Sequence, residues 1–133
     1  MIELVVVIVL LGILSAAALP RFLDLRSDSE LAAMQRLSSS LSSAAAMNLA
    51  RCQITANVAD GVKCIAVSNC TDVGGLLEGG LPAASQPGTS IYIVSQSIST
   101  TANGASANCT VRLDDSSGTA RQSQVFQGIT AGH

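Results

Sequence analysis

The sequence predicts an α+β fold in which a long N-terminal helix packs its C-terminal half on a small antiparallel β-sheet. Three observations indicate this fold. An uncharged apolar run extends from Leu4 to Leu19, and a segment with helical spacing of apolar residues follows it. Three stretches of strand composition lie after residue 88. The chain has 133 residues, which is about one domain on the usual scale of roughly 100–200 residues.

The composition argues against several functional classes. Only 12% of the residues are charged, whereas a soluble domain carries about 25%. The net charge of −2 argues against nucleic-acid binding by bulk electrostatics. The single histidine, His133, argues against a His-based catalytic centre or a zinc site. Because no acid–base pair, nucleophile elbow or phosphate-binding loop stands out, we expect no enzyme activity, no cofactor and no metal.

Residues 1–26 form the first predicted region, an apolar helix that spans a membrane. The run from Leu4 to Leu19, together with Met1 and Ile2, approaches the ~17–25 residues that cross a bilayer. A cleaved signal peptide is the alternative, but it needs a basic N-terminal region and a shorter apolar core. Here the first charge is acidic and the first basic residue is Arg21. A helix buried in a soluble core fits less well, because the remaining residues are mostly small and polar.

Glu3 is the informative residue of this region. A carboxylate within an apolar membrane helix costs ~2.5–3.5 kcal/mol and indicates a functional site by default. The N-terminal end of the helix lowers that cost, because its dipole and free N–H groups favour a negative charge. An amino group of the same chain or of a neighbouring copy would lower it further. The plainer interpretation is a glutamate that sits at the water interface.

Gly12 and Pro20 weaken this helix. Pro20 cannot donate a hydrogen bond to the Ala16 carbonyl and its ring crowds that group, which costs ~3 kcal/mol. Gly12 adds about 1 kcal/mol of weakness. We therefore expect a helix that is kinked or partly unwound between Gly12 and Pro20. Ser15 can supply a partner for a carbonyl that such unwinding releases.

Residues 27–52 form the second region, the amphipathic half of the helix. Its apolar side is expected to pack on the rest of the domain. The basic residues Arg21, Arg26 and Arg36 are candidates for ion pairs between subunits, although a solvated helix face explains them as well. The positions of the apolar stripe are Leu31, Met34, Leu37 or Ser38, Leu41, Ala44 or Ala45, and Cys52.

The last two regions are a connecting loop at 53–88 and an antiparallel sheet at 89–133. Glycine pairs and two prolines mark the loop, which has a short element near residues 64–67. Strand composition appears at 90–99, 107–115 and 120–130, with a hairpin turn at Asp115–Gly118. We interpret Asp114 and Asp115 as part of this turn, and a calcium site is the less favoured alternative.

Four cysteines predict two disulfides in this small headpiece. An even cysteine count in a short exported chain is typical of disulfides, and three pairings are possible. We favour Cys52–Cys64, which ties the helix end to the loop, together with Cys70–Cys109, which pins the loop to the sheet. A headpiece this small buries little surface and needs such links.

The run from Ile2 to Phe22 resembles the N-terminal helix of type IV pilins and of the related type II secretion pseudopilins. The likeness is close over roughly residues 2–26 and looser beyond. Glu3 matches the family's single acid near the mature N-terminus, and Gly12 and Pro20 match its helix-weakening positions. Family members carry a short basic leader and Phe-Thr-Leu before Ile-Glu, whereas Met1 stands at the Leu position here.

The resemblance implies a structural subunit that sits in the bacterial inner membrane and then polymerises into an extracellular helical filament of identical copies. The implied partners are a cytoplasmic assembly ATPase and a membrane platform, and the implied processing is by a prepilin peptidase with N-methylation. The filament would serve adhesion, motility or DNA uptake. We expect the helix to unwind between Gly12 and Pro20 in the assembled fibre, whereas a free subunit keeps only a kink. A type II secretion pseudopilin is the alternative within the family, and a single-pass membrane-anchored surface domain is the alternative outside it.

Overall fold

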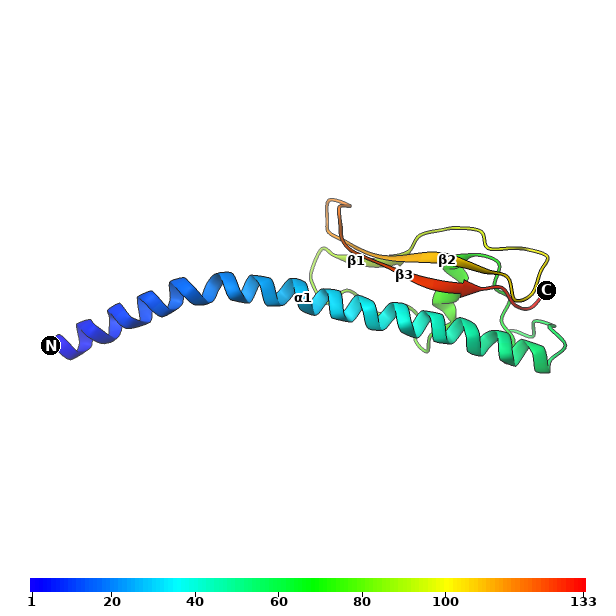
Figure 1. Ribbon diagram of the computed structural model, residues 1–133, viewed down its shortest axis with the longest axis horizontal. Helices are drawn as coiled ribbons and strands as arrows, with labels where there is room; N and C mark the ends of the chain where they lie inside the picture. Colours follow the sequence, from blue (N-terminus) through cyan, green and yellow to red (C-terminus); the bar gives the residue numbers. More distant parts are fainter. The chain divides into compact units, whose positions relative to one another are not determined.

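The computed structural model describes residues 1–133, except for the side chains of residues 23 and 24. In chain order the described elements are α1 (Ile2–Ile54), the 3₁₀ helix η1 (Cys70–Leu76), β1 (Ser90–Ile93), β2 (Ser106–Asp114) and β3 (Ala120–Ile129). The predicted α+β class is confirmed: the C-terminal part of a long helix packs on a three-stranded antiparallel sheet (Figure 1). The chain forms two units, Met1–Ala33 and Met34–His133, which are described separately.

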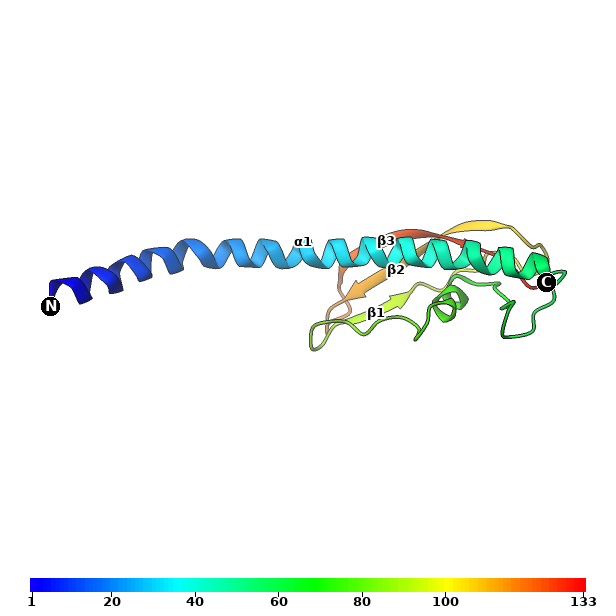
Figure 2. The same ribbon diagram turned by 90° about the horizontal axis from the view of Figure 1, so that it is seen from below.

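The first unit is helical from Ile2 onward. The helix passes through both Gly12 and Pro20 without interruption in this single chain. Figures 1 and 2 show that its blue part curves but does not break. The expected unwinding concerns an assembled fibre and stays a prediction.

The second unit is the headpiece, in which the sheet has the strand order β1-β2-β3. Both pairings are antiparallel, with Ile93 opposite Val111 in the first and Cys109 opposite Phe126 in the second. The cyan-to-green part of α1 lies along this sheet in both views (Figures 1 and 2). The register shifts at Leu113/Asp114, just before the β2–β3 turn.

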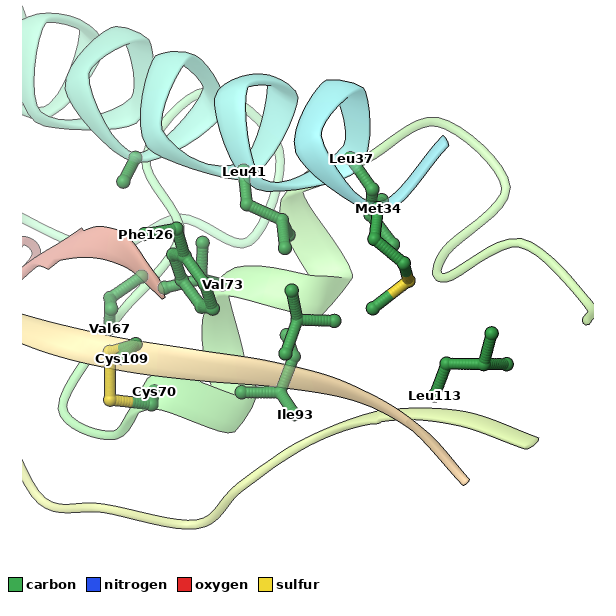
Figure 3. Packing of buried hydrophobic residues seen from close by; sticks show 12 residues of the cluster. Met34, Leu37, Leu41, Val67, Cys70, Val73, Ile93, Cys109, Leu113 and Phe126 are labelled. Atoms are coloured by element: carbon green, nitrogen blue, oxygen red, sulfur yellow. A yellow bond between two sulfur atoms is a disulfide. The ribbon is translucent and has the colours of Figure 1, made fainter. Parts of the chain in front are cut away.

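The main apolar cluster of the headpiece lies between helix and sheet. Met34, Leu37 and Leu41 point from α1 towards the sheet, as Figure 3 shows. Val111 and Phe126 face them from β2 and β3. These three helix residues belong to the predicted apolar stripe. They are three and four residues apart, so their side chains leave the same side of the helix. Asn48 extends the stripe as a buried polar residue.

The connecting segment is more ordered than a plain loop. Asn69 and Asp72 form a capping box that starts η1, and the Cys70–Cys109 disulfide holds its first residue against β2. Sequence analysis did not place this helix. It has seven residues, of which only Cys70, Val73 and Gly74 are buried, so it is too short to show a hydrophobic periodicity.

The first strand is shorter than the predicted 90–99, because β1 ends at Ile93. Beyond it the chain turns to pair with the segment before η1: the Cys70 amide donates to the Gln96 carbonyl and the Ile98 amide donates to the Ser68 carbonyl. Residues 94–99 have the composition of a strand, but they pair with residues 68–70 instead of lengthening β1. Tertiary contacts alone decide whether this segment extends the sheet or pairs with the segment that leads into η1.

Candidate functional site

The apolar part of α1 is exposed along its length. Each large hydrophobic residue from Ile2 to Leu14 is about half exposed or more, with Val6 lowest at 49%. The most apolar window has a mean hydropathy of 2.8 and none of it is buried. Among the described residues, α1 is the one helix long and apolar enough to cross a membrane. A helix from a soluble core with the same composition would be mostly covered by its own chain.

Glu3 occupies the first turn of this helix. Its carboxylate is exposed, and it forms no ion pair with any described side chain. The free N–H groups of the first turn and the positive end of the helix dipole lie beside it. The first turn of this apolar helix therefore carries an exposed carboxylate that can bind an external cation or accept a hydrogen bond.

Gly12, Ser15 and Pro20 lie within the same apolar segment. A Cβ added at Gly12 would meet nothing within 4 Å, so the residue leaves an open notch on the helix surface. The Ser15 hydroxyl donates to the Leu11 carbonyl at 2.6 Å. Pro20 lacks the N–H that would reach the Ala16 carbonyl. The segment thus contains the weak points that sequence analysis assigned to it while remaining helical.

The three candidate intersubunit arginines are all exposed. Arg21 and Arg26 belong to the first unit and Arg36 to the second. Their exposure is what either a solvated face or a contact between copies requires, so their role stays a prediction.

The headpiece is closed by two disulfides, Cys52–Cys64 and Cys70–Cys109. These are the two pairs that the sequence analysis favours. All four cysteines are fully buried, and no free cysteine is present among the described residues. The first link joins the end of α1 to the following loop, and the second joins η1 to β2.

A polar network on β1 and β2 escaped the sequence analysis. The Tyr92 hydroxyl donates to Asp114 Oδ2 at 2.7 Å, and Arg112 Nε lies 3.2 Å from Asp114 Oδ1. The hydrogen bond to the Asp114 carboxylate raises the pKa of Tyr92 above its ordinary value of 10.0. Register explains the cluster, because Tyr92 lies directly opposite Arg112. The sequence contains no signal for that register.

Asp115 lies in the predicted hairpin turn and holds its backbone by hydrogen bonds. Its Oδ1 accepts hydrogen bonds from the Ser117 hydroxyl, the Ser117 amide and the Thr119 amide. These bonds, the one from the Ser117 hydroxyl foremost, lower the pKa of Asp115 below 3.8. Over the part of the chain that is described, no group of three His, Cys, Asp or Glu side chains is arranged to hold a metal ion.

No protein-family model, curated protein or solved structure matches this chain. The functional argument therefore depends on the chain's own geometry.

Proposed function

We propose that this chain is the structural subunit of a type IV pilus. As a free subunit it lies in the bacterial inner membrane through residues 1–26. It then polymerises into an extracellular helical filament of identical copies that serves adhesion, motility or DNA uptake. An assembly ATPase and a membrane platform supply the work.

The observation that supports this proposal is the exposed apolar helix with a lone acid in its first turn. A helix meant only as an anchor has no use for an acid within its apolar end, because the acid costs part of the ~2.5–3.5 kcal/mol that a carboxylate costs at the helix centre. A neighbouring copy that brings a cation or a free amino group to Glu3 removes that cost. The acid therefore favours bundling of copies over simple anchoring.

Transfer of the helix from lipid into a bundle gains little hydrophobic free energy. Lipid tails are about as apolar as leucine, so helix association in a membrane depends on packing and polar contacts. Two contributions to the free energy of association remain. One is a partner for the Glu3 carboxylate, and the other is close packing of small residues such as Gly12 and Ala16–Ala18 against neighbouring helices. External work must supply the rest, which fits an ATP-driven platform.

Outside the membrane the balance reverses. Each Val, Leu or Ile side chain of the apolar run would lose ~1.5–3 kcal/mol if a subunit were released into water. Summed along the exposed run, this cost makes release of a subunit prohibitive. Such an asymmetry suits a durable surface fibre.

The decisive experiment is Glu3→Ala in cells that produce the protein. We expect filaments to be lost while the protein still inserts in the membrane, because the apolar run is intact and only the partner of the neighbour's cation is gone. Electron microscopy of sheared surface material measures filaments, and resistance to alkaline extraction measures insertion.

Glu78→Ala is the matched control, since it removes an exposed glutamate from the headpiece and should leave filaments unchanged. If the wild-type protein forms no filaments and Glu3→Ala behaves like wild type, the chain is a single-pass anchored domain. Short fibres whose loss blocks protein secretion would identify a type II secretion pseudopilin.

A further inference from the structure

The turn at residues 102–105 holds the chain segment 130–133. The Asn103 side chain binds the His133 backbone twice: its Oδ1 accepts from the His133 amide at 3.0 Å, and its Nδ2 donates to the His133 backbone oxygen. A carboxamide suits this role because it offers an acceptor and a donor side by side. We call the two segments and the hydrogen bonds between them the 103–133 clasp.

Thr130 lies at the centre of this clasp and is fully buried. Its hydroxyl accepts from the Ala105 amide at 3.0 Å and donates to the Ala102 carbonyl. Its own carbonyl accepts from the Gly104 amide at 2.9 Å. The Gly104 N–H is therefore occupied as long as the clasp is closed.

The other side of the same segment packs on a different part of the headpiece. The Val67 amide donates to the Ala131 carbonyl at 3.0 Å. Gly132 has a φ of +77°, and a Cβ built there would lie 3.0 Å from the Ala66 Cα. Because this contact is with backbone, a side chain at Gly132 would push the segment away from its place in the clasp.

Asn103 is the one asparagine of the sequence that is followed by glycine. Such a pair is prone to spontaneous deamidation, because glycine has no side chain to hinder attack on the preceding carboxamide. The Gly104 nitrogen loses its proton and bonds to the Asn103 Cγ, and the Cγ–Nδ2 bond breaks with release of ammonia. Water then opens the cyclic imide to aspartate or isoaspartate, with no change of oxidation state.

The closed clasp opposes this reaction at both reacting groups. The attacking nitrogen of Gly104 is engaged with the Thr130 carbonyl, and that hydrogen bond must break before the nitrogen can attack. The Asn103 carboxamide cannot turn towards this nitrogen without giving up both of its bonds to His133. Deamidation therefore requires a chain in which the clasp has opened, and its rate follows the population of that open state.

We propose that Asn103 is a deamidation site that the 103–133 clasp protects, and that opening of the clasp makes it available for modification. The product replaces the Nδ2 donor with a carboxylate oxygen, which faces the His133 backbone oxygen with no hydrogen between them. Isoaspartate also adds one carbon to the backbone of the turn. A modified chain therefore cannot close the clasp again, and the change is one-way. This inference concerns the headpiece and does not depend on filament assembly.

The first experiment compares deamidation of Asn103 in folded and unfolded protein. The full chain is incubated in detergent with and without guanidinium chloride, at one mildly alkaline pH, and peptide mass spectrometry follows the conversion of amide to acid. We expect the folded protein to react about tenfold more slowly or slower still, because the closed clasp occupies both reacting groups. Equal rates in the two samples would overturn the proposal.

The second experiment opens the clasp within the folded protein. Gly132→Ala should raise the Asn103 deamidation rate about tenfold, because its Cβ displaces the 130–133 segment. Gly118→Ala is the matched control: Gly118 has a φ of +78°, but a Cβ there meets nothing within 4 Å. The control therefore introduces the same backbone strain in another turn and should deamidate as wild type does.

Thr130→Val provides a second way to open the clasp, because it removes the buried hydroxyl and keeps a side chain of similar shape. Amide hydrogen exchange of Val67 reports opening in either variant, since this amide donates to the segment. Faster exchange at Val67 without faster deamidation of Asn103 would show that the clasp does not protect the site.

The third experiment tests the consequence of modification. Asn103→Asp reproduces one product and should increase amide exchange at Gly104 and Val67, because the donor to His133 is lost. Asn108→Asp places the same charge on β2 and should leave both amides unchanged. Exchange in Asn103→Asp that equals wild type would contradict the one-way change.

Discussion

Gly128 lies on the inner side of β3 at a point where no side chain fits. A Cβ built there would be 2.6 Å from the Cys109 sulfur and 2.8 Å from the Ile98 Cδ1. The backbone of β3 therefore passes close to the Cys109 sulfur of the Cys70–Cys109 disulfide. The missing side chain is what allows the disulfide, β3 and the segment after β1 to meet.

Gly128→Ala should destabilise the headpiece by ~1–3 kcal/mol, because a methyl group has to displace a disulfide sulfur and an isoleucine in a packed core. Thermal unfolding of the full chain in detergent measures the loss. Gly75→Ala is the control, since a Cβ at Gly75 meets nothing within 4 Å. Equal unfolding temperatures for the two variants would show that β3 can shift without cost.

At the scale of elements, α1 is one continuous helix with two kinds of surface. Its first unit has an exposed apolar surface, and its second unit buries Met34, Leu37 and Leu41 against the sheet. In the loop that follows α1, the Asp60 carboxylate holds the backbone by three hydrogen bonds. Asp60 Oδ1 accepts the amides of Val62, Lys63 and Cys64, and these bonds, that of Cys64 foremost, lower the pKa of Asp60 below 3.8.

Acid should therefore weaken this loop. A carboxyl whose pKa is lowered in the folded state stabilises it fully above the unfolded-state value near 3.8, and the contribution disappears as the pH falls through the lower folded-state value. Asp60→Ala should lower the unfolding temperature at pH 7 and reduce the drop between pH 5 and about pH 2. Amide hydrogen exchange of residues 62–64 gives a local readout.

The comparison variant is Asp28→Ala, which removes an exposed acid from the first unit. It should leave exchange in the 62–64 loop unchanged at every pH. Identical pH profiles for Asp60→Ala and wild type would contradict the assigned role of Asp60.

At the scale of the whole molecule, a small headpiece depends on covalent links. One apolar layer between one helix and three strands leaves a modest core, which favours additional staples. The two disulfides close loops of very different length, with sequence separations of 12 for Cys52–Cys64 and 39 for Cys70–Cys109. A longer closed loop restricts the unfolded chain more.

Replacing Cys70 and Cys109 with serine should therefore cost more than replacing Cys52 and Cys64. Chain entropy gives about 4 kcal/mol for the longer loop and about 3 kcal/mol for the shorter one. Denaturant unfolding of the full chain in detergent, followed by circular dichroism, compares the two double variants. The reverse order would show that native contacts around the helix end outweigh loop length.

Local patterns in the sequence determined most of the elements. The apolar run and the spacing of Met34, Leu37 and Leu41 fix the helix and its packing side, because both signals repeat with the period of the structure they predict. The strand compositions and the Asp115 turn located the sheet for the same reason. Cysteine count and position indicated two links between elements.

The tertiary structure decided whatever depends on partners distant in the chain. The end of β1 at Ile93 and the Tyr92–Asp114 bond both require a register that no local pattern encodes. The groove lined by Arg51 and Lys63 likewise exists only after the loop folds back on α1, because Arg51 belongs to the helix and Lys63 to the loop. Periodicity depends on residues that are close in the sequence, whereas these features depend on the free energy of contacts between residues that are far apart in the sequence.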